Sequence, residues 1–260
     1  MTSDTELALI TGASSGIGRS LAQVFVDEGY DVVVVGQSEG VEEAAAELRA
    51  SGREVLPVRA DLSTAAGVEE LWRAVEATGR PLAAAALNAG VVVSGPFADT
   101  DLAEHLGLVD LNVRSTVHLA KLVVDHMVLW GRGRILMTAS IAAATPGPFQ
   151  STYAASKAFV HSFAEAVGYE LKDTEITVTS LMPGPTDTEI FERADMEDTV
   201  IGQEPKDGPD RVARDGFDAM MAGKPHVRAG NILNKVAAEV ATHLPDRIGA
   251  AVAASQVKPD

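Results

Sequence analysis

The sequence contains no cysteine, and only 5% of its residues are aromatic. The absence of cysteine excludes disulfide bonds, thiolate nucleophiles and cysteine-ligated metal sites, and we predict no bound metal. Hydrophobic residues still make up 46% of the chain, which is enough for a sizeable core. That core must be built mainly from alanine, valine and leucine.

Long apolar runs and clusters of basic residues are also missing. No apolar run approaches the roughly 20 residues that a membrane-spanning helix needs. The 37 acidic residues outnumber the 21 basic ones, and the net charge of −16 speaks against a nucleic-acid surface. The first six residues are polar and acidic, unlike a secretory signal. These features predict a cytoplasmic protein that binds neither membranes nor nucleic acids.

Short apolar runs alternate with amphipathic segments along most of the chain. We expect strands at Leu7–Thr11, Asp31–Val35, Val55–Arg59, Leu82–Leu87, Arg134–Thr138 and Ile176–Leu181. Helical patterns follow the first five strands, and the longest are Leu102–Trp130 and Thr152–Leu171; two more lie near Arg211–Ala222 and Ile232–Leu244. Apolar strands that alternate with helices predict an α/β fold, a doubly wound, Rossmann-type parallel sheet of about seven strands flanked by helices on both faces. We expect one domain over residues 1–260, with a helical C-terminus near 231–254.

A glycine-rich turn follows the first expected strand and opens the first helix. Its spacing is G-x-x-x-G-x-G, and its candidate ligand-binding residues are Gly12, Ser14, Ser15, Gly16, Ile17 and Gly18. Glycine allows a tight turn and a close approach of backbone to ligand. The free N–H groups and positive dipole end of a helix favour a pyrophosphate. An ordinary strand-to-helix turn is the alternative, but the position in a βαβ pattern favours phosphate binding.

Tyr153 and Lys157 are four residues apart on an expected helix, so both project from one face. An unperturbed tyrosine has a pKa near 10, too high for proton exchange at neutral pH. A nearby lysine cation favours tyrosinate and is expected to lower that pKa. The alternative is a half-buried helix tyrosine beside a solvated lysine.

Six motifs in order resemble the short-chain dehydrogenase/reductase family, over roughly Leu7 to Thr188. They are the glycine-rich turn, Asn88-Ala89-Gly90 at the end of the fourth strand, Asn112 in the next helix, Ser140 after the fifth strand, Tyr153-x-x-x-Lys157, and Pro183-Gly184-Pro185-Thr186-Asp187-Thr188 after the sixth. The last part of the chain resembles the branch of that family with an extended helical C-terminus.

The resemblance implies an NAD(P)(H)-dependent oxidoreductase that interconverts a ketone or aldehyde and an alcohol by hydride transfer. Tyr153 would act as general acid and base, and Ser140 would stabilise the developing oxyanion. Lys157 would tune Tyr153 and hold the nicotinamide ribose. Asn112 would position a water that returns a proton to Tyr153 through Lys157. A helix-kink residue bonded to backbone is a second, compatible reading of Asn112.

The resemblance also implies cofactor contacts outside the glycine-rich turn. Asp61 resembles the family's acidic residue at the adenine ring, although a helix N-cap would explain it as well. The implied contacts are Asp61, Leu62, Asn88, Ala89, Gly90, Tyr153, Lys157, Pro183, Gly184, Thr186 and Thr188.

The choice between NAD and NADP depends on the end of the second strand. An acidic residue there would bind the ribose 2′-hydroxyl and repel a 2′-phosphate, but Gly36 occupies the position. Gln37 and Ser38 are neutral and can donate hydrogen bonds to a phosphate, and Arg19 could reach it. The sequence therefore favours NADP(H), with NAD(H) possible.

Residues 186–209 are expected to form a substrate lid, which carries Ile190, Phe191 and Met196 among acidic residues. An apolar cleft that favours a hydrophobic carbonyl or alcohol substrate could be lined by Val91, Val92, Val93, Ala142 and Phe149. A homodimer or homotetramer through the two long helices is expected, with close contact permitted by Ala154, Ala155, Ala158 and Ala166.

Two other functions remain open at this point. One is a catalytically silent NAD(P)-binding regulator or scaffold on the same fold, which would usually lack the tyrosine or the lysine. The other is a related epimerase or dehydratase, which usually has a larger C-terminal region than this chain of 260 residues.

Overall fold

The computed structural model describes residues 5–194, 196, 198–203, 205–230 and 245–257. Within them, one sheet has seven strands in the order β3-β2-β1-β4-β5-β6-β7, and all pairings are parallel. The strands are β1 (Leu7–Thr11), β2 (Asp31–Gly36), β3 (Val55–Arg59), β4 (Leu82–Leu87), β5 (Arg132–Thr138), β6 (Glu175–Pro183) and β7 (His226–Ala229). This confirms the predicted fold class.

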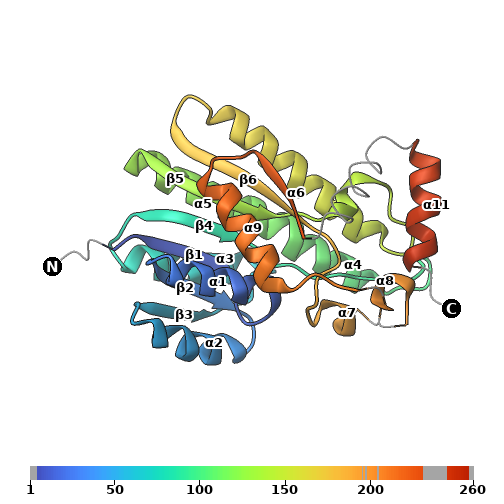
Figure 1. Ribbon diagram of the computed structural model, residues 1–260, viewed down its shortest axis with the longest axis horizontal. Coiled ribbons are helices and arrows are strands. Elements are labelled where there is room, and N and C mark those ends of the chain that lie inside the picture. The colour runs from blue at the N-terminus through green and yellow to red at the C-terminus, as the bar shows by residue number, and fades with distance from the viewer. Residues whose placement is uncertain (1–4, 195, 197, 204, 231–244, 258–260) are drawn as a thin grey trace.

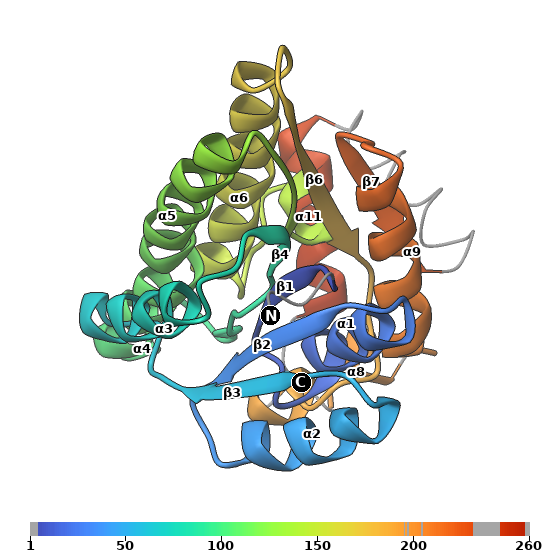
Figure 2. The same ribbon diagram turned by 90° about the vertical axis from the view of Figure 1, so that its left-hand side faces the viewer.

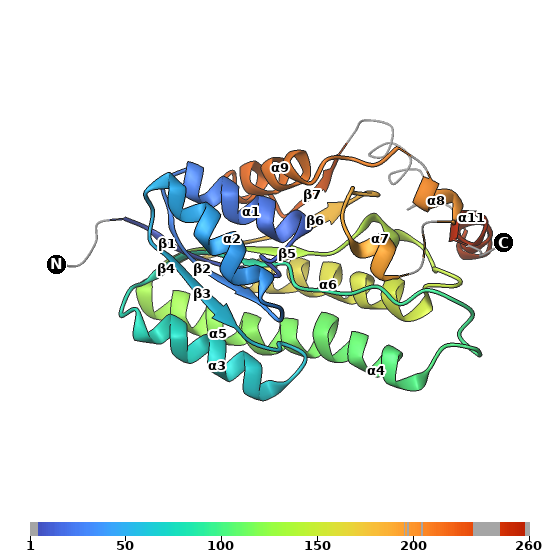
Figure 3. The ribbon, with the colours of Figure 1, turned by 90° about the horizontal axis from the view of Figure 1, so that it is seen from below.

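Helices cover both faces of the sheet, as Figures 2 and 3 show. One face is covered by α1 (Gly16–Asp27), α2 (Gly40–Leu48) and α9 (Pro209–Met221). The other is covered by α3 (Ala65–Ala77), α5 (Ser115–Trp130) and α6 (Ser151–Glu170), with α4 (Leu102–Val109) leading into α5. Short helices α7 (Ile190–Arg193) and α8 (Val200–Gln203) follow β6, and α11 (Asp246–Val257) lies beside α8 at the end towards which the strands point (Figure 1).

The core forms two layers, one on each face of the sheet. Every residue of β1 and β2 is buried, as expected for strands that are covered on both sides. Leu21, Phe25 and Phe217 pack in one layer, and Trp72 and Met127 pack in the other. Phe25 makes an edge-to-face contact with Phe217 at 5.0 Å between ring centroids, which links α1 to α9.

Apart from shifts of one or two residues at the ends of other elements, the structure departs from the predicted elements in three places. The seventh strand, which the apolar pattern did not locate, is His226–Ala229. β6 continues to Pro183, which pairs with Ala229, because a proline in the last position removes no needed ladder hydrogen bond. The expected helix Leu102–Trp130 is interrupted by a π-helical turn at Asp110–Arg114. The expected helix near Ile232–Leu244 lies outside the described residues, whereas α11 overlaps the predicted helical C-terminus.

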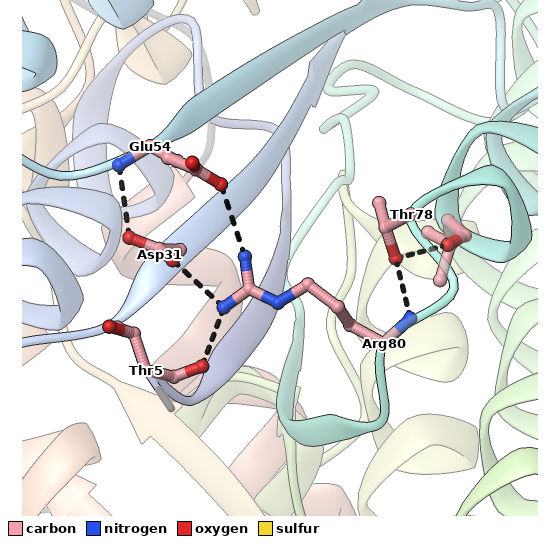
Figure 4. A network of polar contacts seen from close by, with 6 residues as sticks. Thr5, Asp31, Glu54, Thr78 and Arg80 are labelled. Atoms are coloured by element: carbon pink, nitrogen blue, oxygen red, sulfur yellow. Dashed lines mark hydrogen bonds and ion pairs between the residues drawn. The ribbon is translucent and has the colours of Figure 1, made fainter. Parts of the chain in front are cut away.

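A polar network closes the edge of the sheet where the strands begin (Figure 4). Arg80 Nη2 donates to Asp31 Oδ2 at 2.8 Å and to the Thr5 carbonyl at 2.5 Å, while its Nη1 lies 3.3 Å from Glu54 Oε2. Asp31 Oδ1 accepts from the Glu54 backbone N–H at 3.0 Å. The network ties the loop before β4 to the starts of β1, β2 and β3.

The opposite edge holds the carboxyl ends of the strands. The order of the strands reverses between β1 and β4, and parallel sheets bind ligands in the crevice at such a point. The predicted site residues lie at or after the carboxyl ends of β1 to β6, or on the helices behind them. None of the helices in the described part of the chain is long and apolar enough to cross a membrane.

Candidate active site

The turn between β1 and α1 requires its glycines. Gly12 and Gly16 have φ angles of +67° and +54°, in the left-handed region that favours glycine. A Cβ on Gly18 would overlap the carbonyl oxygen of Gly12 and lie 2.6 Å from Asn88 Nδ2. Ser15 precedes α1 without capping it through its hydroxyl. The first N–H groups of α1 thus meet the requirements of an anion site.

Thr11 links this turn to the end of β4. Its Oγ1 accepts hydrogen bonds from the backbone N–H groups of Asn88 and Ala89, both at 2.8 Å, and it is only 2% exposed. Asn88 in turn bonds with the Thr11 carbonyl at 3.3 Å and the Thr138 hydroxyl at 3.1 Å. Asn88 therefore braces β1, β4 and β5. Sequence reasoning missed Thr11; a hydroxyl at the last position of a wholly apolar strand was the available signal.

Asn112 lies in the π-helical turn and bonds to backbone, as the second reading of this residue predicted. Its Oδ1 accepts from the Val91 N–H and its Nδ2 donates to the Val91 carbonyl, both at 2.9 Å. Nδ2 also donates to Ser156 Oγ at 3.1 Å. A Cβ on Gly90 would lie 3.1 Å from Asn112 Oδ1 and 3.3 Å from Lys157 Nζ, so glycine keeps this corner open.

Ser140 lies close enough to Tyr153 to act on the pKa of its phenol. Ser140 precedes a short 3₁₀ helix at Ile141–Ala144, and its Oγ accepts from the Ala142 N–H at 3.1 Å. Its hydroxyl hydrogen can therefore be given to another oxygen. Burial raises the pKa of Tyr153, and the nearby Ser140 hydroxyl acts in the opposite direction.

Lys157 is 6% exposed, and its Nζ donates to the Thr138 carbonyl at 2.9 Å. Burial lowers the pKa of Lys157 to about 8. The expectation that the pKa of Tyr153 is lowered is wrong, because burial raises it. The ammonium lies 5.8 Å from the centre of the Tyr153 ring, and burial lowers its own pKa. A solvated lysine, the alternative reading, is also wrong.

Asp61 follows β3, but it does not cap a helix. Thr64 is the N-cap of α3 and accepts from the Gly67 N–H at 3.0 Å. Asp61 Oδ1 instead accepts from the Ser63 N–H at 3.0 Å and the Ser63 hydroxyl at 2.7 Å. This leaves Asp61 Oδ2 as the carboxylate oxygen outside that turn. Leu62 is 6% exposed and packs in the core, so a cofactor could meet only its backbone.

The end of β2 carries Gly36, with Gln37 and Ser38 exposed after it. A Cβ on Gly36 would lie 3.2 Å from Ser14 Cβ, which places this position against the glycine-rich turn. Arg19 does not reach this corner as a free cation, because it pairs with Glu47 of α2. Arg59 of β3 lies beside Gly36 at this corner. Sequence reasoning missed it because it belongs to the neighbouring strand.

The segment after β6 returns to its own starting point. The Asp187 N–H donates to the Asp207 carbonyl, and the Asp207 N–H donates to the Pro185 carbonyl, both at 2.9 Å. The Thr186 hydroxyl donates to the Gly184 carbonyl at 2.9 Å. Thr188 lies over the glycine-rich turn, since its Cγ2 is 2.9 Å from where a Cβ on Gly16 would be. The chain therefore leaves β6 and comes back beside it, and the hydrogen bonds of Asp187 and Asp207 join the two ends of this loop, which we call the excursion after β6.

An apolar cluster joins this excursion to the C-terminal helix. Met196 and Val257 are 3% and 5% exposed, and the partly buried residues packed against them are Val92, Phe149, Ile190, Ala194 and Ile201. Phe149 has a φ angle of +63°, which is unusual for an aromatic residue, and its carbonyl accepts from the Gly95 N–H at 2.7 Å. Of the five residues expected in an apolar cleft, Val92 and Phe149 join this cluster, whereas Val91, Val93 and Ala142 do not. The Phe191 side chain lies outside the described part.

Comparison with known proteins gives the same assignment as the motifs. Residues 6–198 match the family model for short chain dehydrogenases. The oxidoreductase UcpA of Salmonella typhimurium is 32% identical over 209 residues, which cover 79% of this chain and 76% of UcpA. An uncharacterised oxidoreductase of Staphylococcus epidermidis is 28% identical over 192 residues, 74% of this chain and 82% of the relative.

Two of the similar solved structures cover most of this chain. A short-chain dehydrogenase from Sphingobium yanoikuyae in complex with NADPH has a TM-score of 0.80 and 29% identity, covering 86% of this chain and 87% of that one. A short chain dehydrogenase/reductase from Burkholderia phymatum in complex with NAD has a TM-score of 0.83 and 25% identity, covering 94% of both chains. With the order of its motifs and the geometry of Ser140, Tyr153 and Lys157, the chain belongs to the short chain dehydrogenase family.

Proposed function

We propose that this oxidoreductase reduces a ketone or aldehyde, or oxidises the matching alcohol, with NADP(H) as its preferred cofactor. The observation that carries the proposal is that the Ser140 hydroxyl lies close enough to Tyr153 to lower its pKa, one helical turn from the buried Lys157. A silent cofactor-binding protein would have no reason to keep these three groups together. The chain retains all of them.

The residues at the carboxyl edge fit a dinucleotide. Gly18 lets the start of α1 pack closely on Gly12 and Asn88, and the first N–H groups of α1 are suited to a pyrophosphate. Gly90 leaves room beside Lys157, where a side chain would meet the ammonium. Asp61 Oδ2 and the Leu62 backbone would meet the adenine ring. The nicotinamide, when bound, supplies or accepts the hydride.

The protein's own groups handle the proton. Tyr153 would give its phenolic proton to the oxygen that gains negative charge during reduction, and take it back during oxidation. Ser140 would donate a hydrogen bond to the same oxygen and stabilise that charge. Lys157 would donate to the nicotinamide ribose hydroxyls. Asn112 would place a water behind Lys157 while its side chain holds Val91.

The preference for NADP(H) is part of the proposal. Related structures contain NADPH in one case and NAD in another, so the cofactor differs within this set. Gly36 lacks the carboxylate that would repel a 2′-phosphate, and Ser14 and Ser38 offer hydroxyl donors at the same corner. Contacts of Pro183, Gly184, Thr186 and Thr188 with the cofactor stay predictions.

The apolar cluster supports a hydrophobic substrate. Phe149 and Val92 lie on the loops that carry Ser140 and Gly90, and Met196 and Ile190 cover them from the excursion after β6. Side chains of this kind stabilise an apolar substituent beside the carbonyl and leave a charged one without a partner. Residues 186–209 would act as the lid of this site.

An assay of NADPH consumption against a panel of ketones tests the proposal. We expect kcat/KM to rise with the size of the apolar substituent and to be low for ketones that carry a carboxylate. Binding of NADPH without turnover of any compound would favour the silent regulator instead. Equal or faster turnover with NADH would contradict the cofactor preference.

A cytoplasmic location stays a prediction of the sequence.

We further propose that the chain self-associates through α4, α5 and α6. Large apolar side chains are exposed along these helices, namely Leu102, Leu106, Val117, Val128, Leu129, Trp130, Phe159 and Tyr169. Ala154 is 4% exposed and buried in its own chain, so its expected role in helix contact is wrong. Phe159→Glu should lower the mass measured by sedimentation, whereas Leu56→Glu on β3, 41% exposed, should not.

A further inference from the structure

An arginine from the neighbouring strand stands at the corner where a 2′-phosphate would bind. The pairing of β2 with β3 puts Arg59 directly beside Gly36, and the Ala60 N–H donates to the Gly36 carbonyl at 3.1 Å. Arg59 thus lies at the same level of the sheet as Gly36. An acidic residue at the position of Gly36 would bind the ribose 2′-hydroxyl. Its side chain is 57% exposed and can meet a ligand.

Hydroxyl groups from two other segments border the same corner. A Cβ on Gly36 would lie 3.3 Å from Ser14 Oγ, and one on Gly40 would lie 3.4 Å from Ser38 Oγ and 3.6 Å from Ser14 Cβ. Arg59 Nε donates to the Gln37 carbonyl at 3.3 Å, which directs the guanidinium along the segment that carries Ser38. A guanidinium and two hydroxyls are a suitable donor set for a phosphate monoester.

A carboxylate of the same chain now occupies this arginine. Arg59 Nη1 lies 3.1 Å from Glu39 Oε1, and the glutamate side chain is 83% exposed. An exposed ion pair of this kind contributes little to stability and opens readily. A phosphate monoester carries more charge than a carboxylate and offers three oxygens, so it would compete well for the guanidinium.

We propose that Arg59 selects the phosphorylated dinucleotide by binding its 2′-phosphate, and that Glu39 occupies Arg59 when no phosphate is present. The inference rests on the proposed function, since it concerns the same cofactor site. Glu39 limits the selectivity, because the Arg59–Glu39 pair must open before the phosphate binds. The chain therefore discriminates through a competition between two anions for one cation.

Two nucleotide fragments test this without any turnover. Adenosine 2′,5′-bisphosphate carries the 2′-phosphate, and 5′-AMP lacks it; neither contains nicotinamide. By isothermal titration, Arg59→Met should weaken the bisphosphate about tenfold to a hundredfold and change 5′-AMP less than about twofold. Arg73→Met, an exposed arginine of α3 that bonds to the Glu69 carbonyl of its own helix, is the control for lost charge.

Glu39 gives the opposite result if the competition exists. Glu39→Gln should strengthen the bisphosphate several-fold and leave 5′-AMP unchanged, whereas Glu43→Gln, exposed on α2, should change neither. In the double variant with Arg59→Met, the gain should disappear. A gain that persists without Arg59 would show simple repulsion and overturn the role of the pair.

Other outcomes separate this inference from the proposed function. Equal weakening of both fragments by Arg59→Met would overturn 2′-phosphate selection. Weaker 5′-AMP in Glu39→Gln would mean that Glu39 holds the ribose hydroxyls and that NAD(H) is the cofactor. A wild-type protein that turns over NADPH but shows no effect at Arg59 would overturn the inference alone. Failure of both fragments to bind would overturn the nucleotide site as well.

Discussion

The two edges of the sheet are made by the same strands but are built in opposite ways. At the edge where the strands begin, Arg80 joins Asp31, Glu54 and the Thr5 carbonyl, and its charges are paired (Figure 4). At the carboxyl edge, glycines keep space open, and Lys157 is buried at the cost of a lowered pKa. The comparison indicates that one edge stabilises the fold and the other holds groups whose charge is available for a ligand.

The largest expected effect is at the carboxyl edge. Tyr153→Phe should reduce kcat at least ~100-fold, the usual scale of general acid catalysis, and leave the free energy of unfolding nearly unchanged. Tyr169→Phe, 69% exposed on the same helix, is the matched control. Stopped-flow reduction of a ketone and urea unfolding measure both quantities. Activity within a few-fold of wild type would remove Tyr153 from its assigned role.

The next effect is at the opposite edge and concerns stability only. Arg80→Met should lower the free energy of unfolding by about 3 kcal/mol, because Asp31 would be left as a buried carboxylate without its cation. Asp31 is 4% exposed. Arg132→Met, whose pair with Glu6 is exposed, should cost much less. Cofactor affinity should not change in either variant, and a clear loss in Arg80→Met would show that the edges are coupled.

Thr11 sharpens the comparison, because it lies at the carboxyl edge and yet has a structural role. Thr11→Val removes the acceptor for the N–H groups of Asn88 and Ala89 and should cost about 1–3 kcal/mol of stability. Because both residues border the expected cofactor site, NADPH affinity should fall as well. Thr11→Ser keeps the oxygen and serves as control. A valine variant that loses neither stability nor affinity would contradict the bracing role.

The smallest effect is a dependence on pH. The pKa of Lys157 is lowered to about 8 by burial, so its ammonium is present below that pH and is lost above it. NADPH affinity, measured by fluorescence titration, should therefore fall several-fold as the pH rises from about 7 to 9. Lys157→Met should bind more weakly throughout and lose this dependence. If the affinity of Lys157→Met for NADPH still changes with pH around the same midpoint, the titrating group is not Lys157.

The sequence predicted the fold well because parallel strands buried on both faces read as continuous apolar runs. The motif residues also fell at the strand ends, or on the helices behind them, where they were expected. Sequence reasoning failed where a residue's partner comes from another segment. Arg59 meets Gln37 and Glu39 only through the register of β2 and β3. Thr64 rather than Asp61 caps α3, and two acceptors so close together in sequence could not be told apart without the helix start.

The pKa of Tyr153 shows a second limit. The spacing of Tyr153 and Lys157 gives their relative position on a helix, but it does not give their burial. Burial acts on both groups, raising the pKa of the phenol and lowering that of the amine. An isolated pair would have behaved as the sequence suggested. A cationic nicotinamide ring could restore the expected direction, and no sequence pattern reports that contribution.

The closed base of the excursion after β6 has a consequence for how this protein can change over generations. Its two ends are joined by backbone hydrogen bonds between Asp187, Asp207 and Pro185, which depend little on the side chains in between. Insertions, deletions and substitutions within the excursion can then accumulate while β6 and the glycine-rich turn keep their positions. A lineage could acquire a new substrate range here while its proton-transfer chemistry stays the same.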